Sequence, residues 1–389
     1  MAAGFAARGV PEVHFGVGRA GAIAQDAAAL GDPGRPVVLV SDAALVELGM
    51  VDRLTAPLQA AGAVCAVFAE IAGEPKQAQL EAATDFVRRH DAGLVICLGG
   101  GSAMDVGKVA ATIARAEGGP ADYAMEGRPL PRRGVPKLCL PTTAGTGSEL
   151  SSTNIFTNAA GRKVWVWGSE TKPARVILDP ELTLSLPPHL TAWTGLDAFV
   201  HALEACTNLR RHAWNDLYAH RALGLIAGAL ETAVREPANL AARGDMLLGA
   251  AYAGIAIDNC SAGLAHNLSH ALAALGPVHH GLATALGLEV VLAWQVERDA
   301  GAFAAAAAAC GLGRNAAALV EWYRELLTRC GIERRLPARF AGLGAAALAA
   351  EMRAPETQYM RQSSVRPVGD DDIERFAAAM MALAEEERR

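Results

Sequence analysis

The chain has 389 residues, of which 52% are hydrophobic and 20% charged, and its formal net charge is −6. This length favours two domains, and the composition excludes a largely disordered chain. The charges form no basic stripe, so we expect no nucleic-acid partner.

The cysteines and the apolar runs indicate the compartment. Seven cysteines are scattered along the chain without a Cys-x-x-Cys pair, which is typical of reduced thiols. Residues 1–15 lack the apolar stretch of a signal peptide, and apolar runs such as residues 246–257 are shorter than the roughly 20 residues that cross a bilayer. We therefore expect a cytoplasmic protein with no membrane span.

The first half of the chain alternates between strand and helix patterns. Strands are predicted at residues 36–40, 64–68, 94–98, 137–140 and 176–178, with helical patterns between most of them. This alternation is typical of a parallel sheet covered by helices on both faces, which most often binds a nucleotide at the carboxyl ends of its strands.

The sequence pattern changes from alternating strands and helices to helices alone near residue 185. Pro187 and Pro188 disfavour a continuing helix, and the segments beyond them are rich in Ala and Leu with helical spacing, including a plain Ala helix at residues 300–309. We predict an α/β dinucleotide-binding domain over residues 1–185 and an all-helical metal-binding and catalytic domain over residues 186–389.

A glycine loop follows the strand at residues 94–98. Gly99, Gly100, Gly101 and Ser102 lead into a helical pattern that extends through residue 114. Glycines let the backbone approach a pyrophosphate closely, and the amides at the helix start face the anion. The spacing matches neither Gly-x-Gly-x-x-Gly nor the P-loop, so a plain strand-to-helix turn is an equal alternative.

A second loop, Pro-Thr-Thr-Ala-Gly-Thr-Gly-Ser-Glu at residues 141–149, follows the next predicted strand. Its small hydroxyl side chains suit hydrogen bonds to a polar ligand, although an ordinary turn is the alternative. Neighbouring parallel strands place such loops on one edge of the sheet, so the two loops together favour a cofactor site. Asp42, after an earlier strand, is either a ribose acceptor that favours NAD over NADP or a helix N-cap.

Four of the ten histidines lie between residues 266 and 280. Asp197 and His201 are four residues apart in a helical pattern and therefore share one helix face, and His266 and His270 repeat that spacing. Together with His280 these residues offer one carboxylate and several imidazoles, a set that suits Fe(II), Zn(II), Ni(II) or Co(II). The alternative is a set of structural histidines held by hydrogen bonds.

Four motifs in this order closely resemble those of the iron-containing alcohol dehydrogenases. They are Gly99-Gly-Gly-Ser with Asp105 and Lys108, the loop at residues 141–149, Gly195-Leu-Asp-Ala-x-x-His-Ala-x-Glu-Ala205, and His266-x3-His-x9-His-Gly281. The resemblance is collinear from about residue 16 to residue 281 and looser beyond. It implies the fold of that family, which is similar to that of dehydroquinate synthase, with a parallel-sheet domain before a helical one.

The resemblance also implies roles for single residues. Asp197, His201, His266 and His280 would bind the metal, usually iron and in some members zinc, and His270 would be a proton-relay residue near the nicotinamide. Asp42 stands where members that prefer NAD carry an acid. NAD contacts are implied at Gly99, Gly100, Gly101, Ser102, Ala103, Thr142, Thr143, Thr146, Ser151, Lys163 and Leu182. Glu74 and Lys76 depart from the Asn-Pro pair of many members.

The function that this resemblance implies is an NAD(H)-linked, metal-dependent alcohol dehydrogenase or aldehyde reductase for a small alcohol or aldehyde. The metal would act as a Lewis acid on the substrate oxygen while hydride passes to or from the nicotinamide, and the enzyme would be a homodimer or larger homo-oligomer. The alternatives are a maleylacetate reductase, against which Asp197 counts, a glycerol-type dehydrogenase or sugar-phosphate cyclase, and a non-catalytic metal-binding protein of the same fold.

Overall fold

The computed structural model describes residues 4–125, 127–297 and 300–384. Contacts divide the chain into two compact units. One is residues 8–186, and the other comprises the described residues of 187–389 and 1–7. The predicted fold class is confirmed, because the first unit is built on a parallel sheet and the second is helical.

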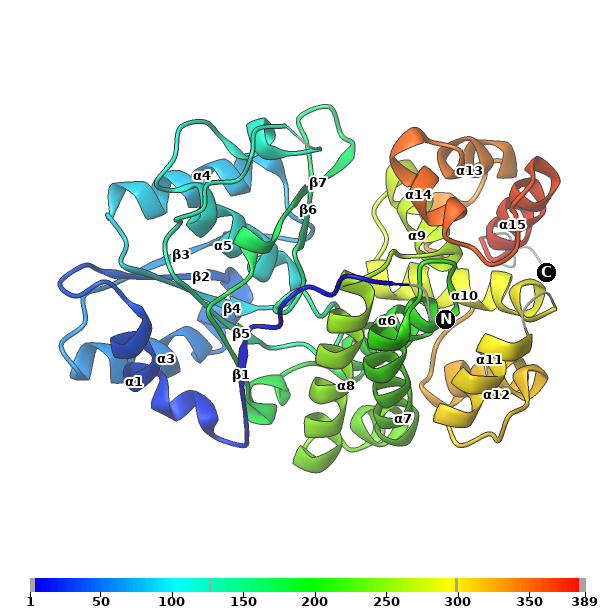
Figure 1. Ribbon diagram of the computed structural model, residues 1–389, viewed down its shortest axis with the longest axis horizontal. Coiled ribbons are helices and arrows are strands. Elements are labelled where there is room, and N and C mark those ends of the chain that lie inside the picture. Colours follow the sequence, from blue (N-terminus) through cyan, green and yellow to red (C-terminus); the bar gives the residue numbers. More distant parts are fainter. Residues whose placement is uncertain (1–3, 126, 298–299, 385–389) are drawn as a thin grey trace. The chain divides into compact units, whose positions relative to one another are not determined.

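The first unit contains a six-stranded sheet in the order β1-β8-β5-β4-β2-β3, and all its neighbouring strands are parallel (Figure 1). The five predicted strands are all present. The β1 strand and an antiparallel hairpin, β6–β7, were not predicted. The bounds are β1 Glu12–Phe15, β2 Val37–Asp42, β3 Cys65–Ile71, β4 Leu94–Gly99, β5 Lys137–Pro141, β6 Thr153–Thr157, β7 Lys163–Trp167 and β8 Arg175–Leu178.

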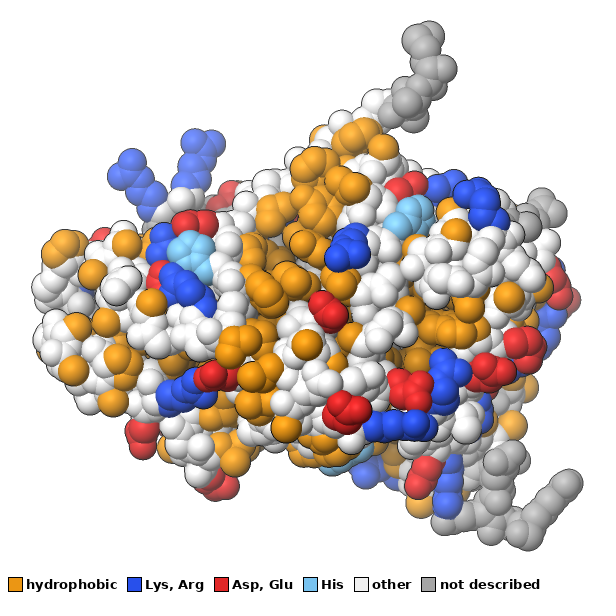
Figure 2. Space-filling model, turned by 90° about the horizontal axis from the view of Figure 1, so that it is seen from below, with side chains coloured by type: hydrophobic (Ala, Val, Ile, Leu, Met, Phe, Trp, Pro, Cys, Tyr) orange, Lys and Arg blue, Asp and Glu red, His pale blue; other side chains and the backbone are white. Residues whose placement is uncertain are grey.

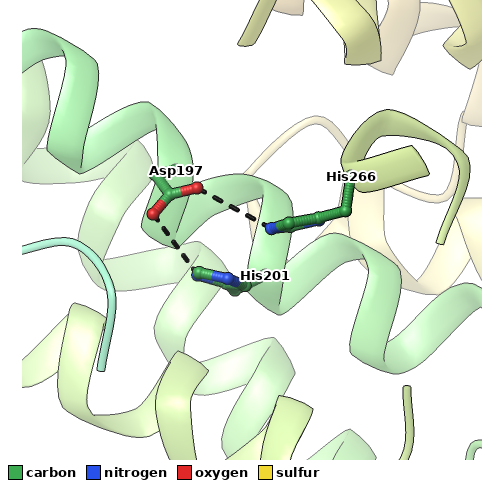
Figure 3. Close-up of side chains that lie close together, drawn as sticks. All are labelled: Asp197, His201 and His266. Carbon is green, nitrogen blue, oxygen red and sulfur yellow. Dashed lines mark ion pairs between the residues drawn. The ribbon is translucent and has the colours of Figure 1, made fainter. Parts of the chain in front are cut away.

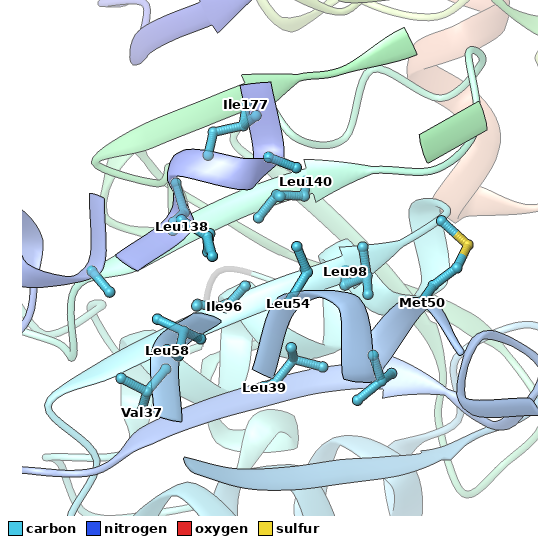
Figure 4. Close-up of a cluster of buried hydrophobic side chains, with 14 of the residues drawn as sticks. Val37, Leu39, Met50, Leu54, Leu58, Ile96, Leu98, Leu138, Leu140 and Ile177 are labelled. Atoms are coloured by element: carbon cyan, nitrogen blue, oxygen red, sulfur yellow. The ribbon is translucent and has the colours of Figure 1, made fainter. Parts of the chain in front are cut away.

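Helices cover both faces of this sheet. Side chains at every second strand position share a face, and one such face packs against α3, which presents Met50, Leu54 and Leu58 at four-residue spacing (Figure 4). On the other face Cys97 lies so close to α5 that a Cβ at Gly107 would be 2.4 Å from its sulfur. The helices are α1 Ile23–Leu30, α2 Ala43–Glu47, α3 Met50–Ala60, α4 Gln77–Arg89 and α5 Gly101–Ile113.

The strand order creates a switch point between β2 and β4. The chain leaves β2 toward β3 at the sheet edge and then returns to form β4 on the other side of β2. In open α/β sheets, ligands bind at the carboxyl ends of the strands where the order reverses in this way. Asp42 ends β2 and Gly99 ends β4, so both lie at this switch point.

In the described part of the second unit, regular structure is helical apart from an isolated bridge between Asn208 and Ser364. The predicted Ala-rich helix is present as α11. The helices are α6 Pro188–Thr207, α7 Ala213–Arg235, α8 Leu240–Asp258, α9 Leu264–Leu275, α10 His280–Val296, α11 Ala300–Ala309, α12 Ala316–Arg329, α13 Ala345–Met352, α14 Gln358–Gln362 and α15 Asp370–Ala382.

One helix in the described part of the chain, α8, is long and apolar enough to cross a membrane by length and composition. Its 19 residues extend beyond the apolar run at residues 246–257, because the first two turns, which include Arg243 and Asp245, and the final Asp258 are helical as well. In this fold 67% of its 18-residue window is buried, and it packs against α6 and α7, as the core helix of a bundle does.

Candidate metal and cofactor sites

The helical unit places Asp197 and His201 on one face of α6. They are four residues apart, and their relative exposures are 2% and 8%. His266, in the first turn of α9, is 3% exposed, and His280 is the first residue of α10. Three elements distant in sequence therefore bring these side chains to one place.

The carboxylate of Asp197 faces both His201 and His266 (Figure 3). Its Oδ2 atom is 3.8 Å from His201 Nδ1, and its Oδ1 atom is 3.8 Å from His266 Nε2 and 3.6 Å from His280 Nε2. One ligand atom from each of Asp197, His201 and His266 lies within 4.8 Å of the other two, and no other such group occurs among the described residues. The rings of His201 and His266 stack with 4.5 Å between their centroids.

The contacts of these atoms fit a divalent cation. Within the described residues, Asp197 Oδ1 and His266 Nε2 are buried without a hydrogen-bond partner, which is costly unless another group satisfies them. Separations of 3.6–3.8 Å are too long for hydrogen bonds. They are shorter than twice the usual metal–ligand distance of about 2.0–2.2 Å, so one ion could touch both atoms of each pair.

His280 and His270 lie beside this cluster. Ser269 Oγ is 3.0 Å from His280 Nδ1, on the ring edge opposite the Nε2 that faces Asp197. Gly281 lets α10 approach α6, because a Cβ there would be 2.3 Å from the carbonyl oxygen of Trp193. The His270 ring centroid is 5.6 Å from that of His280, and His270 is outside the three-residue group.

Glu204, for which we predicted no role, contacts His266 directly. Its Oε2 atom is 2.6 Å from His266 Nδ1. Burial alone would raise the pKa of Glu204, but the charge of His266 and hydrogen bonds from His266, Gly263 and Ala265 hold that pKa below its usual value. Burial opposes charge on His266 too, yet Glu204 and Asp197 raise its pKa. Helical spacing was the one feature of the sequence that could have placed Glu204 near the metal ligands, since it follows Asp197 by seven residues and His201 by three.

In the first unit, the two glycine loops contact each other. A Cβ at Gly100 would be 3.3 Å from Thr143 Cγ2, and one at Gly101 would be 2.8 Å from Thr146 Cγ2. Gly99 has φ +148°, and a Cβ there would also be 2.7 Å from the Cβ of Ala103. These glycines therefore allow a close approach of the loops beside the start of α5, where no side chain of the described residues caps the helix.

Other expected cofactor residues are already engaged within the first unit. Asp42 Oδ1 accepts a hydrogen bond of 3.0 Å from the amide of Leu45, so Asp42 is the N-cap of α2. Ser102 Oγ donates to the carbonyl of Gly73, and Ser151 Oγ donates to that of Thr153. Ala103 and Thr142 are buried, and Leu182 is fully buried within the hydrophobic core.

Lys163 forms an ion pair with one of the residues that depart from the family pattern. Lys163 Nζ is 3.0 Å from Glu74 Oε1. The same β6–β7 hairpin is also bonded to the segment after β3, because the amide of Thr157 donates to the carbonyl of Pro75 over 2.8 Å. Glu74 therefore has a partner here, although it differs from the residue found in many members.

Two charged residues of α5 hold the second glycine loop. Lys108 is fully buried, and its Nζ donates to the carbonyls of Ser148 at 2.6 Å and Ser151 at 3.1 Å. Asp105 accepts hydrogen bonds from the Ser148 hydroxyl and the Ile155 amide. Burial raises the pKa of Asp105. Motif spacing alone could not indicate these contacts, because they join residues 40 to 50 positions apart in sequence.

Charges of both signs are mixed on one face of the protein (Figure 2). On the face that Figure 2 shows, basic and acidic side chains of the described residues are interspersed. That face has no continuous basic track of the kind that follows a phosphate backbone.

Comparison with known proteins gives the family. The iron-containing alcohol dehydrogenase model matches residues 11–180, and the model of the C-terminal domain of Fe-containing alcohol dehydrogenases matches residues 191–376. Long-chain-alcohol dehydrogenase 1 of Geobacillus thermodenitrificans is 35% identical over 73% of this chain and 72% of its own length. The 1,3-propanediol dehydrogenase of Klebsiella pneumoniae is 31% identical over 86% of this chain and 88% of its own.

A solved structure agrees with these matches. Sulfoacetaldehyde reductase from Bifidobacterium kashiwanohense, in complex with NAD+, superposes with a TM-score of 0.88 at 29% identity, covering 98% of this chain and 99% of its own. The resemblance found from four motifs is thus confirmed. Because the two family models together span most of its length, the chain belongs to the iron-containing alcohol dehydrogenase family, whose members are oxidoreductases that act on CH–OH groups.

Proposed function

We propose that the protein is an NAD(H)-linked, metal-dependent alcohol dehydrogenase or aldehyde reductase for a small alcohol or aldehyde. The observation that carries this proposal is the buried group of Asp197, His201 and His266, in which Asp197 Oδ1 and His266 Nε2 have no hydrogen-bond partner among the described residues. His280 completes the proposed ligand set, because its Nε2 atom faces the same carboxylate oxygen.

The proposed ligands suit iron or zinc. Imidazole and carboxylate bind Fe(II) and Zn(II) alike, and the family name supports iron. When bound, the metal supplies Lewis-acid polarisation of a substrate oxygen and NAD(H) supplies or accepts the hydride. His270, beside His280, is our candidate for moving a proton to or from the substrate oxygen.

We propose that the first unit binds the dinucleotide at its paired glycine loops. The amides at the start of α5, where the N-cap Gly100 offers no capping side chain, suit a pyrophosphate. The hydroxyls of Thr143 and Thr146 face that helix start. Gly99, Gly100, Gly101, Ser102, Ala103, Thr142, Ser151, Lys163 and Leu182 complete the proposed set. The NAD+ complex of the sulfoacetaldehyde reductase supports this cofactor. Leu182 is fully buried in the hydrophobic core, so it would support the dinucleotide site by packing behind the residues that contact the cofactor.

Asp42 is proposed to favour NAD over NADP. Its Oδ1 atom caps α2, while a Cβ built on Gly99 would be 3.4 Å from Oδ2, so the carboxylate lies beside the first glycine loop. A carboxylate there would repel a 2′-phosphate. Asp42→Ala should raise the affinity for NADPH relative to NADH, and equal ratios in the variant and the wild type would count against this role.

We also propose that the protein is a cytoplasmic homo-oligomer. The β1 strand lies at the edge of the sheet, and Val13, Phe15 and the neighbouring Val17 are exposed. An exposed, apolar edge strand is a ready template for pairing with another chain. Light scattering on the purified protein would give the mass, and a monomer at micromolar concentration would contradict this part of the proposal.

The function is tested by metal content and turnover together. Wild-type protein reconstituted with Fe(II) or Zn(II) should oxidise NADH with members of an aldehyde panel, and Asp197→Ala and His266→Ala should lose both metal and turnover. His220→Ala on α7, a histidine outside the cluster, is the matched control and should keep both. Full metal content and turnover in the Asp197 and His266 variants would overturn the proposal.

Chelation separates the proposal from its main alternative. Exhaustive removal of divalent metal should abolish turnover, and adding Fe(II) or Zn(II) back should restore it. Activity that survives chelation would favour a maleylacetate reductase-like enzyme instead. Bound metal without reduction of any aldehyde or oxoacid would favour a non-catalytic metal-binding protein.

A further inference from the structure

Glu204 carries out two tasks at the same place in the helical unit. It is 4% exposed and projects from α6, on the face that also presents Asp197 and His201, because positions i, i+4 and i+7 of a helix are neighbours. It is not a member of the three-residue metal group. Its carboxylate instead contacts the chain at the start of α9.

The first task is to cap α9. This helix begins at Leu264, and its N-cap residue is Gly263, which has no side chain to accept hydrogen bonds from the first turn. Glu204 accepts them instead, from the amide of Gly263 at 2.6 Å and that of Ala265 at 2.9 Å. A negative charge at a helix N-terminus is favourable, since unpaired amides point toward it.

The second task concerns His266, in the same first turn. Glu204 Oε2 is 2.6 Å from His266 Nδ1. Because Oε1 and Oε2 already accept hydrogen bonds from amides, and a carboxylate is an acceptor only, the hydrogen of this pair belongs to Nδ1. His266 Nε2, the buried atom that faces Asp197 Oδ1, is then the ring nitrogen that can offer a lone pair.

Gly263 is required by this arrangement. A Cβ at Gly263 would be 2.9 Å from both Cδ and Oε1 of Glu204, closer than real Cβ contacts come. Glycine at this position lets the carboxylate come close enough to reach two amides and one imidazole at once. Glu204 and Gly263 therefore act as a pair, although 59 residues separate them in sequence.

We propose that Glu204 is a positioning residue that fixes the tautomer and orientation of His266 for metal binding, while it caps the helix that carries this histidine. The inference rests on the proposed function, because it presumes that His266 is a ligand. Partners of this kind orient metal-binding histidines, and their loss typically lowers metal affinity about 10- to 100-fold.

The test is the affinity of the full-length, metal-free chain for Co(II), measured by calorimetry and by the visible absorption of the bound ion. Glu204→Gln keeps the size of the side chain but replaces one acceptor oxygen with an NH2 group. This donor would face the Gly263 amide, the Ala265 amide or the His266 imidazole, which donate to Glu204. We expect the Co(II) affinity of this variant to fall about 10- to 100-fold. Gly263→Ala does not change the Glu204 residue itself, but its Cβ would push the Glu204 carboxylate away from His266, so this variant should weaken Co(II) binding as well.

The matched control separates positioning of His266 from general support of the loop. Asn208 Nδ2 donates to the carbonyls of Glu204 and Ser261, whereas the hydrogen bond that His266 forms within the described residues is with Glu204. Asn208→Ala should therefore lower the unfolding midpoint without changing the Co(II) affinity of the folded protein. An equal loss of affinity in Asn208→Ala and Glu204→Gln would overturn the proposal, since the effect would then be general.

The possible outcomes distinguish this inference from the proposed function. If the wild type binds Co(II) and the Glu204→Gln variant binds it equally well, the role of Glu204 is wrong while the metal site stands. If Glu204→Gln does not fold, Gly263→Ala decides, and wild-type affinity in that variant would overturn the role. If the wild-type chain binds no Co(II), the proposed function fails and this inference fails with it.

Discussion

Glu149→Gln is expected to remove a pH-dependent loss of stability from the α/β unit. Glu149 ends the second glycine loop and is 3% exposed, and burial raises its pKa from 4.5 to about 7. Between these values the carboxyl is protonated in the folded chain and ionised in the unfolded one, so stability falls as pH rises. The contribution of the neutral Glu149 carboxyl to the free energy of unfolding is fully present below pH 4.5 and is lost once the pH passes about 7.

The magnitude follows from the two pKa values. Their difference corresponds to about 3 kcal/mol, of which about 2.5 kcal/mol should be lost between pH 5 and pH 8. Hydrogen exchange of amides in α5 and β5, read by mass spectrometry at both pH values, reports on this unit alone. Glu149→Gln should remove this loss, and Glu47→Gln, at an exposed position, should retain it. A wild-type pH dependence in Glu149→Gln would refute the reasoning.

Three further substitutions test other parts of the structure. Asp26→Asn should lower the free energy of unfolding by about 2–3 kcal/mol in denaturant titrations, because the carboxylate of Asp26 forms ion pairs with Arg19 and Arg175. Burial alone would raise the pKa of Asp26, but these arginines lower it, so this stability should be lost as the pH falls through that lowered pKa. Gly101→Ala should weaken NADH binding about tenfold in a fluorescence titration, a cost of about 1.4 kcal/mol that is typical of overpacking, because its Cβ would meet Thr146; unchanged binding would contradict the contact between the loops. Gly281→Ala should lower metal content, measured by elemental analysis, because α10 would be forced away from α6.

Much of the fold could be predicted because the buried strands have distinctive sequences. The β2 and β4 strands are continuous apolar runs, as strands covered on both faces are, and the five predicted strands are present. The β1 strand was missed because only one of its four residues, His14, is even partly buried. The β6–β7 hairpin was missed because it lies outside the main sheet and its buried and half-buried residues form no long apolar run.

The candidate site was predictable where chemistry and helix spacing coincide. Asp197 and His201 could be paired from their four-residue separation, and His266 joins them in the structure. The role of Glu204 could not be predicted, because a glutamate within a helix normally faces water and its partners at Gly263 and His266 are about 60 residues away. For Asp42, spacing left two roles open, and the structure gives it a capping bond while the cofactor role stays a proposal.

The central claim is that one divalent cation is held in the helical unit by Asp197, His201, His266 and His280. An anomalous diffraction map of crystals of the Fe(II)-loaded protein, recorded at the iron absorption edge, tests it most directly. We predict a single strong peak about 2.0–2.2 Å from the carboxylate and imidazole atoms that face one another here. A peak elsewhere in the chain, or these four side chains pointing apart around an empty centre, would contradict it.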